Sequence, residues 1–294
     1  MANLKTLRKR IRSVSNTKQI TKAMKMVAAA KLRRAQERAF ASRPYSKGMD
    51  RLVRSLSAAM ASNDNAPPLL VGRGVPNPRV EILVCTADRG LCGSFNSAII
   101  RSVRQKAAEL QAKGFKVTLN CVGRKGFDVL RRQFGDQIRS HHGGMAQGFS
   151  FAKVEEKVAV ELLSAYEDNK FDVCLMVFNT FQSAMSQHLT WRQIIPAMEE
   201  KVEEEEELSS YMTEPEETEL MESLLPRNIA VQIYQALAES EASEHGARMT
   251  AMENAVRNAT DMIRKLTITF NRTRQAAITK ELMEIIGGAE SLKG

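Results

Sequence analysis

The first 42 residues show a helical spacing of apolar side chains. Residues 2–42 contain no Gly and no Pro, and a stripe recurs every three or four residues at Leu4, Leu7, Ile11, Val14, Thr21, Met24, Ala28, Leu32, Ala35 and Ala39. This spacing places the stripe on one side of a helix. Pro44 is expected to end or kink the helix, because proline lacks the N–H that would bond back to residue 40. The pattern resumes over residues 49–60, and the Pro-, Gly- and Asn-rich residues 63–79 are expected to form a linker.

The last 70 residues carry a stricter repeat. A helix is expected from Pro226, a favourable first-turn residue, to Gly287-Gly288, a favourable stop. Steps of three and four alternate through Met249, Met252, Val256, Ala259, Ile263, Leu266, Phe270, Thr273 and Ala277. This alternation is the seam of a coiled coil over four heptads. After Ala277 the apolar residues occupy more than one side of the helix.

The middle of the chain alternates between two periodicities. Short apolar runs at residues 80–87, 116–123, 171–181 and 188–197 predict strands, the last of them beside the third. Helical patterns separate these runs at residues 94–112, 125–134 and 151–168. Alternation of strands and helices indicates a mostly parallel sheet with covering helices.

Length then constrains the architecture. A globule of 294 residues would be on the order of 50 Å across, whereas a helix over residues 2–42 is about 60 Å long. The terminal helices should therefore project and pair with each other. We predict the α/β fold class: a long antiparallel coiled coil of the N- and C-terminal helices, with an inserted Rossmann-like α/β head. The predicted parts are residues 1–62 (first shaft helix), 63–79 (linker), 80–197 (head), 198–225 (acidic insert and linker) and 226–294 (second shaft helix).

Charge is distributed unevenly. The net charge is +9, but residues 1–60 hold sixteen Lys and Arg against Glu37 and Asp50, and residues 199–222 hold twelve Glu against Lys201. The Glu-rich run is expected to be a solvated loop, or else a dock for a basic partner. No apolar run is long enough to span a membrane, and the N-terminus lacks the apolar core of a secretory signal.

Candidate chemistry is sparse. The phosphate-loop, nucleophile-elbow, zinc-protease and C-x-x-C motifs are absent from the sequence. The strongest candidate is the turn after the first strand, formed by Asp88, Arg89, Gly90, Leu91, Cys92 and Gly93, whose glycines could expose N–H groups to a phosphate or simply close the turn. His141-His142 is expected to lie in an exposed turn, and Cys85, Cys121 and Cys174 should be buried thiols within strands. We therefore expect no catalytic residue, no cofactor and no metal site.

Three segments carry a resemblance to a known family. Residues 11–32 (IRSVSNTKQITKAMKMVAAAKL), the turn 88–96 (DRGLCGSFN) and the C-terminal stretches 240–252 and 271–289 resemble the gamma subunit of the rotary F-type ATP synthase of bacteria. The resemblance runs in order along the whole chain and is weakest at residues 198–212. The regulatory cysteine pair of chloroplast members is missing there, so thiol regulation is not expected.

The resemblance implies a function without catalysis by this chain. It implies a central rotor shaft, one copy per complex, inside a ring of alpha and beta subunits, with its head beside an epsilon subunit on the membrane ring of c subunits. Rotation would couple proton flow to the catalytic beta subunits, on the cytoplasmic face of the inner membrane. The residues implied to contact the beta subunits are Lys22, Met24, Lys25, Arg248, Arg274, Gln275 and Thr279.

Two other classes of function remain open at this stage. The positive charge of residues 1–60 would suit a helical nucleic-acid-binding module, although an apolar seam interrupts the basic residues and no aromatic stacking platform accompanies them. The α/β head could instead carry a nucleotide-dependent enzyme. Salt-dependent DNA binding would identify the first class, and nucleotide turnover by the purified chain would identify the second.

Overall fold

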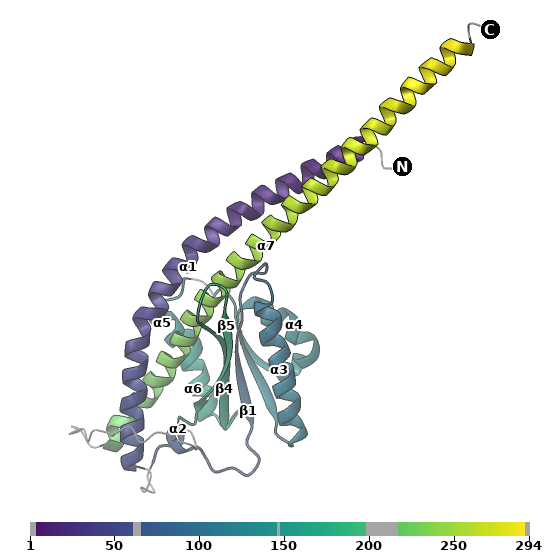
Figure 1. Ribbon diagram of the computed structural model, residues 1–294. Helices are drawn as coiled ribbons and strands as arrows, with labels where there is room; N and C mark the ends of the chain where they lie inside the picture. The colour runs from purple at the N-terminus through teal and green to yellow at the C-terminus, as the bar shows by residue number, and fades with distance from the viewer. Residues whose placement is uncertain (1–3, 61–65, 146–147, 198–216, 292–294) are drawn as a thin grey trace. The chain divides into compact units, whose positions relative to one another are not determined.

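The computed structural model describes residues 4–60, 66–145, 148–197 and 217–291 (Figure 1). The chain divides into two units: residues 1–28 together with residues 249–294, and residues 29–248. The first unit contains only the outer portions of two long helices, and the second holds the sheet. The part of the Glu-rich segment at residues 198–216 lies outside the described residues.

The two terminal helices differ in how they compare with the predicted bounds. Helix α1 (Leu4–Met60) lies within the predicted residues 1–62 and continues through Pro44, so of the two outcomes expected there, an end is excluded. Helix α7 (Glu217–Ser291) begins before Pro226 and continues through Gly287 and Gly288, so both predicted boundaries are wrong. An interior proline costs about 3 kcal/mol relative to alanine. Burial of neighbouring side chains offsets this cost, as at Leu225 and Ile229 beside Pro226.

The second unit is built on a five-stranded sheet with the order β3-β2-β1-β4-β5. Its strands are β1 (Val80–Cys85), β2 (Val117–Val122), β3 (Ile138–His142), β4 (Val173–Phe181) and β5 (Gln187–Ile195). The first four are parallel and β5 runs antiparallel to β4, which confirms the predicted mostly parallel sheet. Strand β3 was not predicted, and the exposed turn expected at His141-His142 is wrong, because these residues end β3.

One face of the sheet is covered by α3 (Phe95–Ala112) and α4 (Arg124–Phe134), which precedes a 3₁₀ turn at Gly135–Gln137. Their apolar sides pack on the side chains of Ile82 and Val84. The opposite face packs against α5 (Phe151–Val154), a π-helical turn (Glu155–Ala159), α6 (Val160–Glu167) and the stretch of α7 near Ile229. The sheet is therefore buried on both sides, as parallel sheets require.

Burial along the chain follows these layers. Cys85, Cys121 and Cys174 are buried free thiols, as predicted, and burial raises the pKa of Cys85 and of Cys121 to about 12. The short helix α2 (Pro68–Val71), inside the predicted linker, joins a small cluster with Val53, Leu56 and Leu225. Residues 229–245 of α7 are almost all buried, because this part of the helix packs against the sheet side and α1 together.

In the first unit only a stripe of each helix is buried. All nine predicted seam positions from Met249 to Ala277 are buried or half-buried, while most flanking residues are exposed. The guanidinium of Arg8 lies 5.7 Å from the ring centre of Phe270, and the Lys25 ammonium lies 3.0 Å from Glu253 Oε1. The two contacts are 17 residues apart along each helix and run in opposite directions. The helices therefore form the predicted antiparallel pair in a defined register.

This register can be tested by cross-linking. It places Val14 opposite residue 264, next to the seam position Ile263, so Val14→Cys combined with Ile263→Cys should be joined by a short thiol-reactive cross-linker. The matched control combines Val14→Cys with Phe270→Cys, in which the second site moves one heptad, about 10 Å, along the helix. The native cysteines are buried and should not compete. Gel electrophoresis should show a high yield only for the first pair; equal yields would contradict the register.

Candidate partner-contact surfaces and the turn after β1

The three N-terminal contact candidates on α1 differ in their exposure to solvent. Lys22 is exposed, whereas Met24 and Lys25 are half-buried in the helix pair. Lys25 Nζ donates to Glu253 Oε1 at 3.0 Å, and this ion pair lowers the pKa of Glu253. Lys25 therefore already has an acidic partner within the chain, and Lys22 is the more available cation.

The C-terminal candidates Arg274, Gln275 and Thr279 are all exposed on α7. Thr279 Oγ1 donates to the backbone carbonyl of Gln275 at 3.0 Å. No ion pair joins Arg274 to another described residue. These three side chains are therefore available to a partner.

The end of α7 is apolar on more than one side. Five large side chains are between 49% and 71% exposed: Ile278, Leu282, Met283, Ile285 and Ile286. The register of the helix pair places Leu4 near residue 274, so residues 278–291 extend past the described part of α1. An exposed apolar surface of this kind marks an interaction site.

Arg248 lies in the other unit and has partners within the chain. Only 8% of the residue is exposed, and its Nη2 lies 2.6 Å from Glu244 Oε1. The same nitrogen donates to the carbonyls of Arg89 and Gly90 at 3.4 and 3.2 Å. Arg248, which the resemblance implies to contact a beta subunit, therefore already has an acidic partner within the chain, Glu244.

Burial shifts the protonation of the groups around Arg248. Desolvation raises the pKa of Glu244, although the Arg248 guanidinium acts in the opposite direction. Desolvation, followed by the charge of Arg248, lowers the pKa of His245 to about 4. His245 is consequently neutral at pH 7, and its Nδ1 lies 3.1 Å from Arg248 Nη1, which can donate to it.

The predicted turn Asp88–Gly93 joins the loops at the carboxyl ends of three strands. Asp88 Oδ1 accepts the backbone N–H groups of Arg124, after β2, and Gly144, after β3, at 3.0 and 3.1 Å. Leu91 has a φ of 63° and is 63% exposed. Cys92 is buried, and burial raises its pKa, so its thiol is a poor nucleophile. The turn is a structural junction that presents one apolar side chain to solvent.

The crevice that related folds use for nucleotides is filled by α7. In a doubly wound sheet that crevice lies at the carboxyl ends of the strands where the order reverses, here between β1 and β4. Glu239 accepts the N–H of Phe181 at 3.0 Å, and Ser243 donates to the carbonyl of Asn179 at 3.1 Å. A Cβ added to Gly246 would lie 3.2 Å from the Ala184 backbone. A phosphate could enter here only by displacing the helix.

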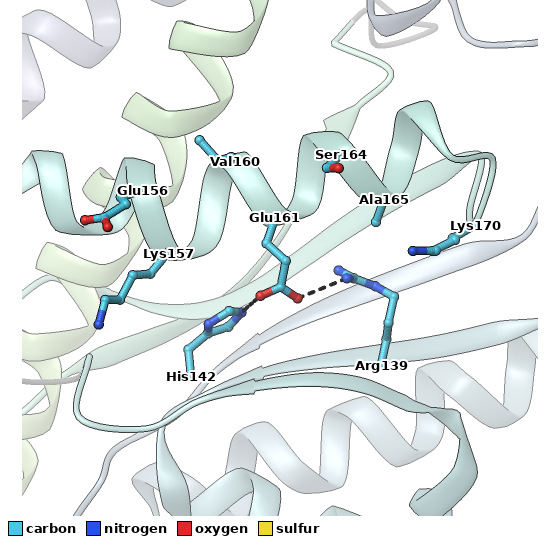
Figure 2. A pocket seen from close by; sticks show the side chains of 9 residues that line it. All are labelled: Arg139, His142, Glu156, Lys157, Val160, Glu161, Ser164, Ala165 and Lys170. Carbon is cyan, nitrogen blue, oxygen red and sulfur yellow. Dashed lines mark hydrogen bonds and ion pairs between the residues drawn. The ribbon is translucent and has the colours of Figure 1, made fainter.

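A separate hollow of about 740 Å³ lies beside β3 and α6 (Figure 2). Arg139 donates to the buried Glu81 at 2.7 Å and to Glu161 at 3.1 Å. Glu161 also faces His142, whose Nε2 is 3.5 Å away and whose pKa is lowered by burial. Figure 2 shows the Glu161 carboxylate between these two groups. The charges at its centre are paired with one another, so we assign no chemistry to this hollow.

Two further features bear on the class of protein. Within the ranges that the structure describes, no group of three His, Cys, Asp or Glu side chains could hold a metal ion. Among the described helices, none is both long enough and apolar enough to cross a membrane.

The buried His245 gives a testable pH dependence. As pH falls, the unfolded chain protonates this residue near 6.5, while the folded chain resists until about 4. Acidification below pH 6.5 therefore lowers the free energy of unfolding, because the unfolded chain binds a proton that the folded chain does not. The loss is at most roughly 2 kcal/mol at pH 5. Denaturant unfolding at pH 7 and pH 5 should show a smaller loss for His245→Gln than for the unchanged protein. The raised pKa values of Glu241 and Glu244 act in the opposite direction in both proteins and cancel in the comparison. Equal losses would contradict the assignment.

The chain has close relatives of the same length. Residues 3–292 match the family model described as ATP synthase. The ATP synthase gamma chain of Magnetococcus marinus is 59% identical over 294 residues and covers 100% of both chains. Those of Chelativorans and Rhodospirillum rubrum are 50% and 49% identical, each over 99% of this chain and 100% of its own length.

Solved structures agree with these relatives. A chain in the central stalk and c-ring structure of the Tetrahymena thermophila mitochondrial ATP synthase is 26% identical, with a TM-score of 0.59 over 80% of this chain and 99% of its own. A chain from the Euglena gracilis mitochondrial ATP synthase has a TM-score of 0.69 over 98% of this chain and 94% of its own, and at 24% identity it supports the fold alone. The chain therefore belongs to the ATP synthase gamma chain family.

Proposed function

We propose that this chain is the central rotor shaft of a proton-translocating F-type ATP synthase, present in one copy and itself without catalytic residues. The observation that carries the proposal is the end of α7, where exposed apolar residues follow Arg274, Gln275 and Thr279. Such a surface must be covered in a stable assembly. A ring of alpha and beta subunits enclosing this end would cover it.

The mechanism follows from the asymmetry of the helix pair. One side of the pair carries the half-buried Met24 and the Lys25–Glu253 ion pair, whereas the residues past Ala277 belong to a single helix. A ring of three like catalytic subunits therefore meets three different surfaces. Each surface stabilises a different conformation of the subunit that it touches, because a contact shifts an equilibrium only by its differential affinity. Rotation would move every beta subunit through these states in turn.

The lack of catalysis by this chain is supported by the filled crevice. The turn after β1 has its carbonyls at Arg89 and Gly90 bonded to Arg248, and the Asp88 carboxylate would repel a phosphate placed beside it. We infer that nucleotide chemistry belongs to the beta subunits.

The proposed location is the cytoplasmic face of the bacterial inner membrane, with the sheet-containing unit beside an epsilon subunit and a ring of c subunits. One related structure contains a central stalk with a c-ring, and another contains F1 with a c-ring. The nucleic-acid alternative is not supported, because the seam of residues 4–28 is occupied by α7 and the chain belongs to a family of rotary-enzyme subunits.

The contact role of Arg274 can be tested in the assembled enzyme. Arg274→Ala should lower ATP-driven proton pumping in membranes, because a charge-assisted hydrogen bond to a beta subunit, worth about 1.5–3 kcal/mol, would be lost. The matched control is Arg264→Ala, an exposed arginine on the same helix within the two-helix portion. Pumping should be measured per ATP hydrolysed at equal amounts of assembled complex. Unchanged pumping in Arg274→Ala would show that this side chain only flanks the seam.

Replacing Asp88 tests whether the turn after β1 contributes to folding but not to ATP hydrolysis. Asp88→Asn weakens two backbone hydrogen bonds to a charged acceptor and should lower the free energy of unfolding by about 1–3 kcal/mol. ATP hydrolysis per assembled complex should not change, and the isolated chain should bind no nucleotide in equilibrium dialysis. Tight nucleotide binding by the purified chain would refute the non-catalytic role.

A further inference from the structure

Three buried carboxylates lie within six residues of α7. Glu239, Glu241 and Glu244 are at most 8% exposed, and their partners are Arg43, Arg38 and Arg248. Removing a charge from water costs several kcal/mol, and apolar residues of similar volume often stabilise a fold as well as a buried ion pair does. Stability alone therefore does not explain why three pairs are placed together here.

The pair of Arg43 and Glu239 connects three elements at one point. Arg43 on α1 donates to both carboxylate oxygens of Glu239 on α7, through Nε at 2.6 Å and Nη2 at 3.0 Å. The same Nη2 donates to the carbonyl of Phe181, at the end of β4, at 3.2 Å. Glu239 in turn accepts the N–H of Phe181 at 3.0 Å. Both side chains thus hold the backbone of one residue, Phe181, at the end of β4.

A second joint lies two helical turns further along α7. Arg248 donates to the carbonyls of Arg89 and Gly90 in the turn after β1, while Glu244 holds its guanidinium in place. The two joints attach α7 to the carboxyl ends of the two adjacent central strands β4 and β1. Between them, Gly246 packs closely against the backbone of Ala184.

Apolar side chains of both small and large size are buried near these joints. Ala39, Ala236 and Ala238 belong to one buried cluster with Ile233 and Leu237. Apolar burial is non-directional, so these contacts do not by themselves set the angle of a helix. The two parallel hydrogen bonds of an arginine–carboxylate fork are directional, so they weaken when the angle between the guanidinium and the carboxylate changes.

We propose that two joints together resist torsion and fix the rotational angle of the helices α1 and α7 against the sheet. The first is the Arg43–Glu239–Phe181 contact, and the second is the contact of Arg248 with the turn after β1. The inference rests on the proposed rotor function, since a twisting load exists only in a rotor. It assigns Arg43, Glu239 and Arg248 a positioning role in energy coupling, and it accounts for ion pairs that folding alone does not require.

The experiment measures torsional stiffness in the assembled enzyme. The alpha–beta ring is fixed to a surface, and a bead is attached through Lys113→Cys, an exposed site just after α3; the native cysteines are buried. With rotation arrested by a bound nucleotide analogue, the angular variance of the bead reports the compliance of the rotor. Arg43→Met should increase this variance by roughly twofold, because one of two directional joints is lost. The matched control, Arg33→Met, breaks a solvent-exposed pair with Glu37 and should leave the variance unchanged.

The outcomes separate the two proposals. A bead that never rotates with ATP, even on the unchanged chain, would refute the rotor function. Rotation with equal variance in Arg43→Met and the unchanged chain would overturn the joint while leaving the rotor function standing. If Arg43→Met does not assemble, Arg43→Lys decides, because lysine keeps the charge but cannot form the fork. A larger variance in Arg43→Lys supports the joint, and an unchanged variance overturns it.

Discussion

The structure depends on one helix that is packed on several sides at once. Between residues 228 and 248, α7 lies against α1 and against the sheet side of the second unit. Nearly every residue of this stretch is buried, including the polar Asn228, Gln232 and Gln235. A helix surrounded in this way cannot present a solvated polar face. Each buried polar group must be paired inside the protein or cost about 1–3 kcal/mol. Where carboxylates occupy this stretch, the ion pairs with α1 and the bonds to the strand ends offset part of the cost of burying them.

The same requirement decides what the α/β unit can do. Its sheet has the strand order that places a ligand crevice between β1 and β4. In this chain Glu239, Ser243 and Arg248 use the backbone groups at those strand ends, which a phosphate or ribose would otherwise contact. A fold suited to binding a nucleotide is thereby converted into an attachment for a helix. Fold class alone does not show whether such a crevice is open to a ligand.

Much of this architecture could be predicted from the sequence, because strong periodicity reports local packing. The seam from Met249 to Ala277 was correctly predicted, since each position faces a single partner helix. Strand β3 was missed because its sequence, Ile138–His142, contains one apolar residue and four polar ones, and such an edge strand shows no period. The prediction of a boundary at Pro226 is wrong because tertiary packing of neighbours such as Leu225 and Ile229 overrides the local signal. The boundary predicted at Gly287 is also wrong, and no packing among the described residues explains why the helix continues there.

The joint residues could not be identified from the sequence for a different reason. Glu239, Glu241 and Glu244 look like a solvated face, since acidic residues on helices usually are. The partners of Glu239 and Glu241 lie on α1, about 200 residues away in the sequence, and a pairing over that separation has no local signature.

A change in composition along α7 does carry information, because it marks where the surroundings of the helix change. Residues 228–247 contain no Lys or Arg, whereas cations recur from Arg248 onwards. Long cationic side chains suit the exposed flanks of a two-helix seam, while a helix buried on all sides excludes them unless each is paired. Arg248 stands at this boundary, and it is the cation there that is buried, paired and bonded to the sheet. The position at which cations return therefore coincides with the point where α7 leaves the sheet-containing unit, and a single arginine at that point both ends the buried stretch and anchors it.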